Sequence, residues 1–252
     1  MKRATLLKAH WRYLAVLNFE IEARLLLPFI PKGVELDLFR GRTLISLVGF
    51  EFAGAELLGV PVPFHQLFPE MNLRCYVKRD VEGEMRRGVL FLKEIVPCRA
   101  VVFVANRIFN ESFSLGKMTH TVRWGERSKE VRYTVELGGW RASLDVRSTD
   151  QASNDPQLAF VLDRNLAYNV SRSGITWEYQ VDRLAWHAFP ATSFELQLDA
   201  ELIYGATLGA ALRHAPCSAA LVDGSAVRVH RGMAIEPKRA QIGQSTINAA
   251  MS

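Results

Sequence analysis

The sequence predicts a mainly β fold of the α+β class, in which one large, barrel-like curved sheet carries a few helices outside it. Short apolar or alternating segments recur between Gly and Pro turn signals and give roughly ten or more strands. These strands do not alternate with helices as they would in a parallel α/β protein. No internal repeat and no Gly/Ser-rich linker divides the 252 residues, so we expect one domain.

The first part of the chain is expected to supply strands and one short helix. Leu14 to Phe19 is an apolar run of strand length, and prolines end a helix expected over Glu20 to Phe29. A turn at Arg40-Gly41-Arg42 joins strands over Glu35 to Phe39 and Thr43 to Phe52. Further strands are expected over 70–77, 88–96 and 100–109.

The second part begins with a meander and continues with a helix signal. The meander is expected over 119–124, 130–137 and 140–147, with glycines at its turns. Asp155 offers an N-cap and Pro156 a first helical residue, which predicts a helix over Gln157 to Asn165. A hairpin, a strand and a helix are then expected over 168–181, 194–199 and 201–213.

Near the end of the chain, Asp223-Gly224 lies between apolar runs at Cys217 to Val222 and Ser225 to Val229. Because Asp-Gly favours two-residue turns, these runs are predicted to form a hairpin. From Met233 onward the composition becomes polar and irregular. We therefore expect one domain over residues 1–232 and a frayed tail over 233–252.

Composition argues against several classes of partner. The formal net charge is +5, but the basic residues are scattered, whereas nucleic-acid-binding arms carry blocks of like charge. Three cysteines without Cys-x-x-Cys spacing give no disulfide framework or zinc motif, which favours a reducing cytoplasm. The start lacks the apolar run of a signal peptide, and no stretch approaches the ~18 apolar residues of a membrane span. We expect a cytoplasmic protein without nucleic-acid or membrane partners; a homo-oligomer stays open.

Familiar cofactor and nucleophile motifs are missing from the sequence. It has no Gly-x-Gly-x-x-Gly, P-loop or Gly-x-Ser-x-Gly pattern, so no phosphate cradle or nucleophile elbow is predicted. The six histidines are dispersed, and no metal-binding spacing links them. We therefore expect neither a cofactor nor a metal.

The most informative stretch runs from Glu70 to Val77, directly after Pro69. Polar and apolar residues alternate strictly here, as they do on a β-strand with two different faces. The polar face carries a carboxylate, an amide, a guanidinium and a phenol: Glu70, Asn72, Arg74 and Tyr76. If this face points into a closed sheet, it forms the wall of a polar pocket; if it points outward, it is an ordinary solvated strand.

Charged residues on other expected strands are weaker candidates. Lys93 and Glu94 are neighbours, so at most one of them can face inward, and for both an outward-facing charge is the favoured interpretation. The same holds for Glu178. Arg12, between Trp11 and Tyr13, fits a stacked surface arginine and a pocket arginine equally well.

Seven dispersed runs are distinctive when taken together: 10–18, 33–37, 59–63, 70–77, 107–111, 178–181, and 204–205 with 221–225. In this order they resemble the bacterial YqjF-like family, a family of unknown function. The resemblance covers residues 9 to 232 and includes the pocket strand at 70–77 and the run at 107–111. This family is in turn remotely similar to acetoacetate decarboxylase. The resemblance implies a cone-shaped β-barrel with flanking helices and a pocket inside the cone.

The decarboxylase comparison also implies site residues. Its carboxylate-binding arginine falls on Arg12 and one of its glutamates on Glu70, whereas the second glutamate falls near Ser46 and is missing. Its Schiff-base lysine falls near Ser112 to Ser114 and is missing too; Lys117 lies close but has no second lysine beside it. This departure argues against Schiff-base decarboxylation, because a serine cannot replace an amine nucleophile.

These observations predict a pocket for a small carboxylate or another oxo-anionic metabolite. Glu70 is the acid/base candidate. The expected ligand-binding residues are Arg12, Asn72, Arg74, Tyr76 and Glu111. A lyase, hydrolase or isomerase would use Glu70 in this way. The alternative is a non-catalytic binding or structural protein in which Glu70 and Arg74 form a buried ion pair.

Overall fold

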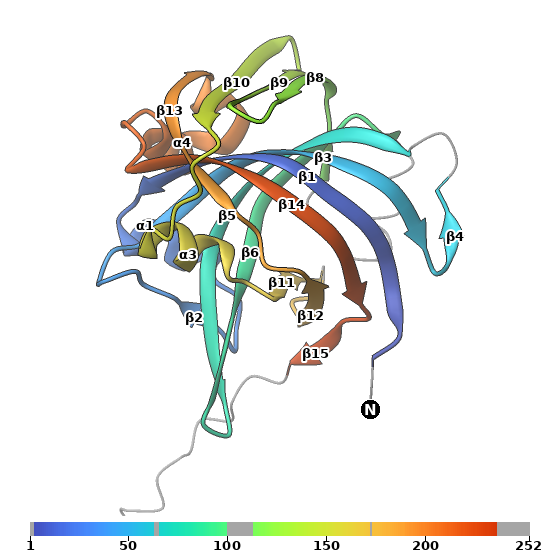
Figure 1. Ribbon diagram of the computed structural model, residues 1–252. Helices are drawn as coiled ribbons and strands as arrows, with labels where there is room; N and C mark the ends of the chain where they lie inside the picture. Colours follow the sequence, from blue (N-terminus) through green and yellow to red (C-terminus); the bar gives the residue numbers. More distant parts are fainter. Residues whose placement is uncertain (1–2, 63–65, 100–112, 172, 236–252) are drawn as a thin grey trace, which may run out of the picture.

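The computed structural model describes residues 3–62, 66–99, 113–171 and 173–235. Most of this part of the chain is strand (Figure 1). The strands are β1 (Thr5–Glu20), β2 (Glu35–Leu36), β3 (Leu44–Leu57), β4 (Val60–Pro61), β5 (Leu67–Val81), β6 (Glu84–Val96), β7 (Phe113–Leu115), β8 (Lys117–Trp124), β9 (Ser128–Leu137), β10 (Trp140–Thr149), β11 (Leu166–Val170), β12 (Thr176–Arg183), β13 (Ala188–Gln197), β14 (Ser218–His230) and β15 (Met233–Ile235). The helices are α1 (Ala23–Leu26), the 3-10 turn η1 (Leu27–Phe29), α3 (Pro156–Leu162) and α4 (Ala200–Leu212).

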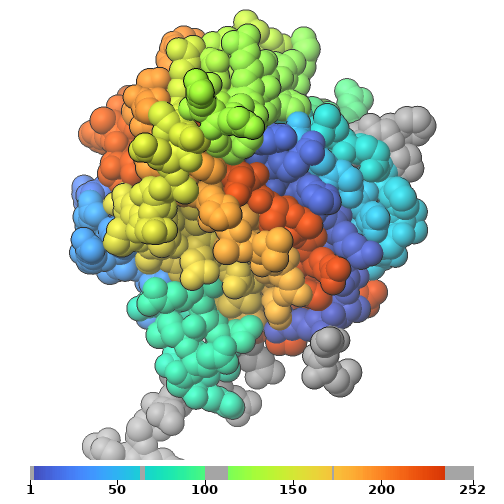
Figure 2. Space-filling model, in the orientation of Figure 1, coloured from blue at the N-terminus to red at the C-terminus, as the bar shows by residue number. Residues whose placement is uncertain are grey.

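The central feature is a closed ring of strands within one large mixed sheet. Backbone hydrogen bonds join β12, β11, β6, β5, β3, β1 and β14 in that order, and β12 pairs again with β14. The β11–β6 pairing is parallel, and the other pairings in the ring are antiparallel. The long strands curve around a common interior, and the end of the β5–β6 hairpin projects from the body of the molecule (Figures 1 and 2). The predicted barrel-like sheet with few helices is confirmed.

A second layer covers part of the barrel. Beyond β14 the sheet continues through β13, β10, β9 and β8, and these strands lie over one side of the ring together with α4 (Figure 1). Outward-facing residues of the ring pack against this layer in one core that includes Leu47, Leu73 and Leu144. Tyr133 packs on Gly49, where a Cβ atom would lie only 2.6 Å from Tyr133 Cδ2.

The interior of the barrel forms a separate core, and α3 contributes to it. Leu158 and Val161 of α3 pack with Val48 and Tyr76 of the ring. The helix begins where the sequence predicts it, because Asp155 Oδ1 accepts the Gln157 N–H at 2.7 Å and Pro156 occupies the first turn. Alternate side chains of β5 therefore belong to different cores: one set packs against the second layer, and the other set faces the barrel interior.

The hairpin predicted at Asp223-Gly224 is wrong, because β14 runs continuously through these residues. Gly224 has φ 82° and lies opposite Arg12, so close that a Cβ atom would overlap the Trp11 carbonyl oxygen. Tyr13, which follows Arg12 on β1, has φ 56°. The two strands kink together here, and the Asp-Gly pair supplies the left-handed backbone that the kink requires.

The same kink changes which residues face the barrel. Trp11 faces the interior before Tyr13, and Leu14 faces it after, so the alternation shifts by one residue. Met233–Ile235 pair with β12, which extends the sheet three residues past the boundary expected at 232. The strand expected over 100–109 lies outside the described residues.

Candidate functional site

A cavity of ≈ 200 Å³ lies inside the barrel. Along β5 it is lined by Phe68, Glu70, Asn72 and Arg74. These side chains share one face because alternate residues of a strand point to the same side. The other lining residues are Leu7, Trp11, Leu14, Val48, Phe50, Phe52, Ala55, Leu57, Val62, Phe91, Glu94, Phe113, Ala167, Tyr179, Val181, Trp186 and Val229.

Glu70 combines burial with a polar neighbourhood. It is 5% exposed, and Asn72 Nδ2 donates to its Oε1 at 3.2 Å. Burial raises the pKa of Glu70 to about 7, against the opposing effects of the Asn72 hydrogen bond and the positive charge of Arg74. A carboxyl group with a pKa near 7 can both give and accept a proton at neutral pH.

Several polar atoms at this cavity lack partners. Arg74 Nε and Asn72 Oδ1 are buried and form no hydrogen bond within the described part of the chain, and the same is true of Trp11 Nε1. Each unpaired buried donor or acceptor costs about 1–3 kcal/mol. Such groups are exceptional in folded proteins, and a bound molecule is one way to satisfy them.

Glu94 is a cavity residue that sequence reasoning missed. It is 4% exposed, lies opposite Asn72 across the β5–β6 pair and lines the cavity, so its expected outward orientation is wrong. The pairing between β5 and β6 shifts by one residue between Leu73 and Arg74. Because of this irregularity, Phe91 and Glu94 both reach the cavity although they are three residues apart. The pairing of Glu94 with Asn72, a residue already expected in the pocket, is the feature that indicates its inward orientation.

The lysines considered from the sequence lie elsewhere. Lys93 Nζ donates to the Ile203 carbonyl oxygen of α4 at 2.5 Å. Lys117 is largely exposed and pairs with Glu136 at 3.4 Å. No lysine is present among the described residues that line the cavity.

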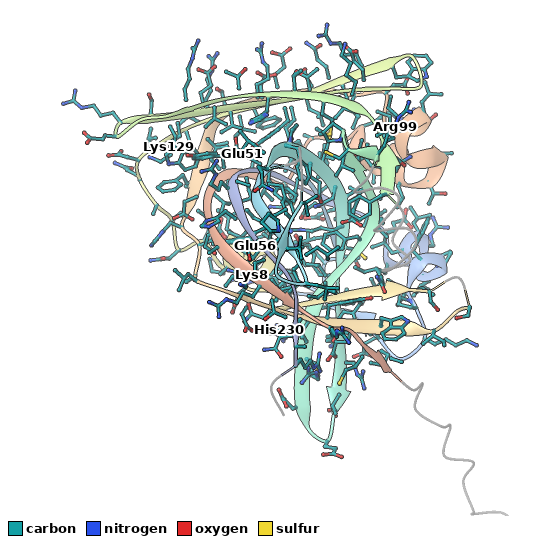
Figure 3. All side chains as sticks on the ribbon, turned by 90° about the vertical axis from the view of Figure 1, so that its right-hand side faces the viewer. Lys8, Glu51, Glu56, Arg99, Lys129 and His230 are labelled. Carbon is teal, nitrogen blue, oxygen red and sulfur yellow. The ribbon has the colours of Figure 1, made fainter. Side chains whose placement is uncertain are left out.

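Tyr76 and Arg12 do not line the cavity. The Tyr76 hydroxyl hydrogen-bonds to Ser46 Oγ, and its ring packs against Phe160 of α3 with a centroid separation of 5.4 Å. Arg12 lies beside the kink, and its Nε donates to Glu51 Oε1 at 2.8 Å. Glu51 in turn contacts His120 of β8 at 2.7 Å, so this cluster lies where the barrel meets the second layer (Figure 3). Glu111 lies outside the described residues.

Glu178, also expected to face outward, is 1% exposed and fully engaged. Arg86 holds it through two hydrogen bonds, Nε to Oε2 at 3.1 Å and Nη2 to Oε1 at 2.6 Å. Tyr168, Arg3 and Arg79 contact the same carboxylate at 3.1, 3.4 and 3.8 Å. Glu178 does face away from the cavity, because Tyr179 and Val181, its alternating neighbours on β12, line that cavity. The expected exposure to water is wrong, because these groups replace the water that the carboxylate would otherwise need.

Two further features of the described residues concern metal ligands and membrane spans. No three His, Cys, Asp or Glu side chains gather there as a set of metal ligands. None of the helices in that part of the chain has the length and apolar character needed to span a membrane.

The barrel and its interior cavity place this chain in the class of acetoacetate-decarboxylase-like folds. It resembles an acetoacetate decarboxylase from Legionella pneumophila with a TM-score of 0.64 and 12% identity, over 93% of this chain and 89% of that one. It resembles the enduracididine biosynthesis enzyme MppR in complex with pyruvate with a TM-score of 0.66 and 14% identity, over 95% and 93%. It also resembles an acetoacetate decarboxylase-like enzyme from Sphingomonas wittichii RW1, with a TM-score of 0.63 and 12% identity, over 94% of this chain and 95% of that one.

A family model matches residues 8–225 and carries the description "Uncharacterized conserved protein (COG2071)". The chain belongs to this family, DUF2071. This agrees with the expected membership of a family of unknown function that is remotely similar to acetoacetate decarboxylase. No curated protein matches the chain in sequence.

Proposed function

We propose that this protein binds a small carboxylate or another oxo-anionic metabolite in the barrel cavity, and that Glu70 moves a proton on it. The observation that carries the proposal is the pair of Arg74 and Glu70 in one cavity. Arg74 is 8% exposed, yet its Nε has no partner in the described structure. A guanidinium with an unpaired Nε–H suits a carboxylate or phosphate-like oxygen.

Glu70 supplies the acid/base chemistry in this proposal. Its raised pKa of about 7 leaves both protonation states populated at neutral pH. Asn72 holds Oε1 of the carboxyl group and so fixes the orientation of the group beside Arg74. With a ligand anion on Arg74, the Glu70 carboxyl would donate a proton to, or accept one from, a neighbouring oxygen or carbon of the ligand.

Schiff-base chemistry is not part of the proposal. The described cavity wall has no amine nucleophile. Treatment with acetoacetate and borohydride should therefore leave the mass of the protein unchanged. A stable adduct on Lys93 or Lys117 would overturn this part of the proposal.

The fold supports a carboxylate ligand by analogy. A structure of MppR is described as a complex with pyruvate, so a protein of this fold holds a small carboxylate.

In the alternative interpretation, Glu70 and Arg74 form a structural ion pair. The structure favours the ligand proposal, because Glu70 bonds to Asn72 while Arg74 Nε stays unpaired.

The test is a thermal-shift screen with small carboxylates and aldehydes, followed by calorimetric titration of each hit. Arg74→Met should remain folded and lose carboxylate binding at least tenfold, whereas Arg123→Met, at a largely exposed arginine, should bind normally. Glu70→Gln should keep its fold and lose turnover of any hit that reacts. If Arg74→Met and Glu70→Gln unfold while the wild type binds nothing, the structural ion pair is correct instead.

A further inference from the structure

The cavity is much more aromatic than a site for a pyruvate-sized acid requires. Its wall includes Trp11, Phe50, Phe52, Phe68, Phe91 and Trp186. Several of these rings contact one another: Trp11 meets Phe50 at 5.8 Å between centroids, and Phe52 stacks on Phe68 at 5.0 Å. A wall of this kind gains free energy only when it is covered by apolar surface.

The charged groups are confined to one side of the cavity. Glu70 and Arg74 lie on β5 and Glu94 lies on the adjacent strand β6. The aromatic residues Trp11, Phe50 and Phe52 come from β1 and β3, and Trp186 comes from the segment after β12. A molecule that fills the space therefore meets the charged groups on the side of β5 and β6, with Phe68 and Phe91 beside them, and only aromatic and apolar side chains from β1 and β3.

The size of the cavity fits a ring together with a charged group. An apolar protein cavity of about 150 Å³ is large enough to hold benzene. The cavity here measures ≈ 200 Å³, which leaves room for a carboxylate and a short link beside such a ring. A pyruvate-sized acid would leave much of the aromatic wall uncovered.

The charges also limit the ligand. Arg74 is the one guanidinium or ammonium group among the described lining residues, and two carboxyl groups, Glu70 and Glu94, share the cavity with it. A second negative charge on the ligand would lie in this poorly solvated space without a cation of its own. Arg74 can therefore pair with at most one anionic group of a ligand.

From these features we infer that the ligand is a monocarboxylate with an aromatic or similarly bulky apolar body, its carboxylate on Arg74 and its ring against Trp11, Phe50 and Trp186. This inference rests on the proposed function and narrows it to a substrate class. The site selects against small keto acids through its walls and against dicarboxylates through its charge.

The test compares ligands that differ in one property at a time. Calorimetric titration with acetate, pyruvate, phenylacetate, phenylpyruvate, phenylsuccinate and benzyl alcohol varies the ring and the charge separately. Phenylacetate should bind about 50-fold more tightly than acetate, because it buries a ring of roughly 100 Å² or more. Phenylsuccinate and benzyl alcohol should each bind at least tenfold more weakly than phenylacetate.

A cavity-filling variant supplies a second readout. Ala167→Leu adds side-chain volume to the cavity wall. It should weaken the binding of phenylacetate at least tenfold and leave the binding of acetate unchanged. Ala206→Leu, on the exposed face of α4, is the matched control and should change neither. The ligand comparison on the wild type stands by itself if Ala167→Leu does not fold.

The outcomes separate this inference from the proposed function. If acetate or pyruvate binds as tightly as phenylacetate, the cavity binds carboxylates and the aromatic selectivity is wrong. If phenylsuccinate matches phenylacetate, the limit to one charge is wrong. If no acid binds and Arg74→Met changes nothing, the proposed function fails and the inference fails with it.

Discussion

Glu70 and Glu178 are both glutamates on barrel strands, and both are almost completely buried, at 5% and 1% exposure. Their surroundings differ. Glu178 is bonded by Arg86 and Tyr168 and flanked by two further arginines, and these contacts lower its pKa despite burial. Within the described part of the chain Glu70 has one hydrogen bond, from Asn72, and burial raises its pKa.

This difference distinguishes a structural carboxylate from a candidate functional one. A buried charge whose partners saturate it holds the fold together, and it has no capacity left for a ligand. A buried acid with few partners, in a cavity beside a guanidinium whose Nε is unpaired, destabilises the empty protein and leaves hydrogen-bonding groups available to a ligand. Four experiments test whether the two glutamates differ in this way.

The largest expected effect comes from the arginine partners. Arg86→Met should destabilise the protein by about 3 kcal/mol, because it removes the two strongest bonds to the buried Glu178 carboxylate. Arg74→Met should cost less than about 1 kcal/mol, because Glu70 can take up a proton instead. Urea unfolding at pH 7 measures both; equal losses would show that Glu70 and Arg74 also form a structural pair.

The second effect is a pH dependence with opposite signs. The pKa of Glu70 is about 7 in the folded chain and 4.5 ordinarily, so its contribution to stability is full below pH 4.5 and is lost as pH rises through 7. The difference approaches about 3 kcal/mol at high pH. Glu70→Gln should therefore be more stable than the wild type at pH 8 and equal to it at pH 4.5.

Glu178 should behave in the reverse direction. Its pKa is lowered, so the stability it contributes is present above its ordinary pKa and is lost as pH falls through the folded value. Glu178→Gln should lose stability at pH 8 and approach the wild type in acid. Unfolding of both variants at pH 5 and pH 8 gives the comparison, and parallel curves would contradict it.

A smaller effect is expected at Tyr168. Tyr168→Phe removes the hydroxyl that donates to Glu178 Oε2 at 3.1 Å, which should cost about 1–2 kcal/mol. The loss should be smaller in the Glu178→Gln background, since the hydroxyl then donates to a neutral amide oxygen instead of a carboxylate. A double-mutant cycle by thermal unfolding measures this, and additive losses would rule out that coupling.

The smallest effect concerns Asn72. Asn72→Leu removes the hydrogen bond that lowers the pKa of Glu70, so that pKa should rise above 7 while stability changes by less than about 1 kcal/mol. Carbon NMR titration of the Glu70 carboxyl group follows this directly. An unchanged midpoint would mean that the 3.2 Å contact does not influence the acid.

The sequence predicts the local features of this fold well. The alternation from Glu70 to Tyr76 places these residues on the inner face of the barrel, and three of them line the cavity. The N-cap at Asp155 begins α3 as expected. These features depend on neighbours within a few residues, so the pattern of the chain specifies them.

Features that depend on distant pairing were harder to predict. Asp223-Gly224 has the sequence of a hairpin turn, but β14 continues through it and pairs with β1 both before and after it. Glu94 could not be oriented from its own strand, because the register shift opposite Arg74 changes the alternation. Both cases turn on which residues pair across two strands, and the residue pattern of one strand does not specify that pairing.

The sequence by itself determined which residues share a face of each strand, because side-chain direction follows the backbone with a period of two. Only the tertiary structure decided what each face meets. Closure of the ring between β12 and β14, together with the kink at Tyr13 and Gly224, creates an interior, and α3 fills part of it. The physical reason is that a cavity is enclosed by strands from opposite ends of the chain, and no local pattern encodes their contact.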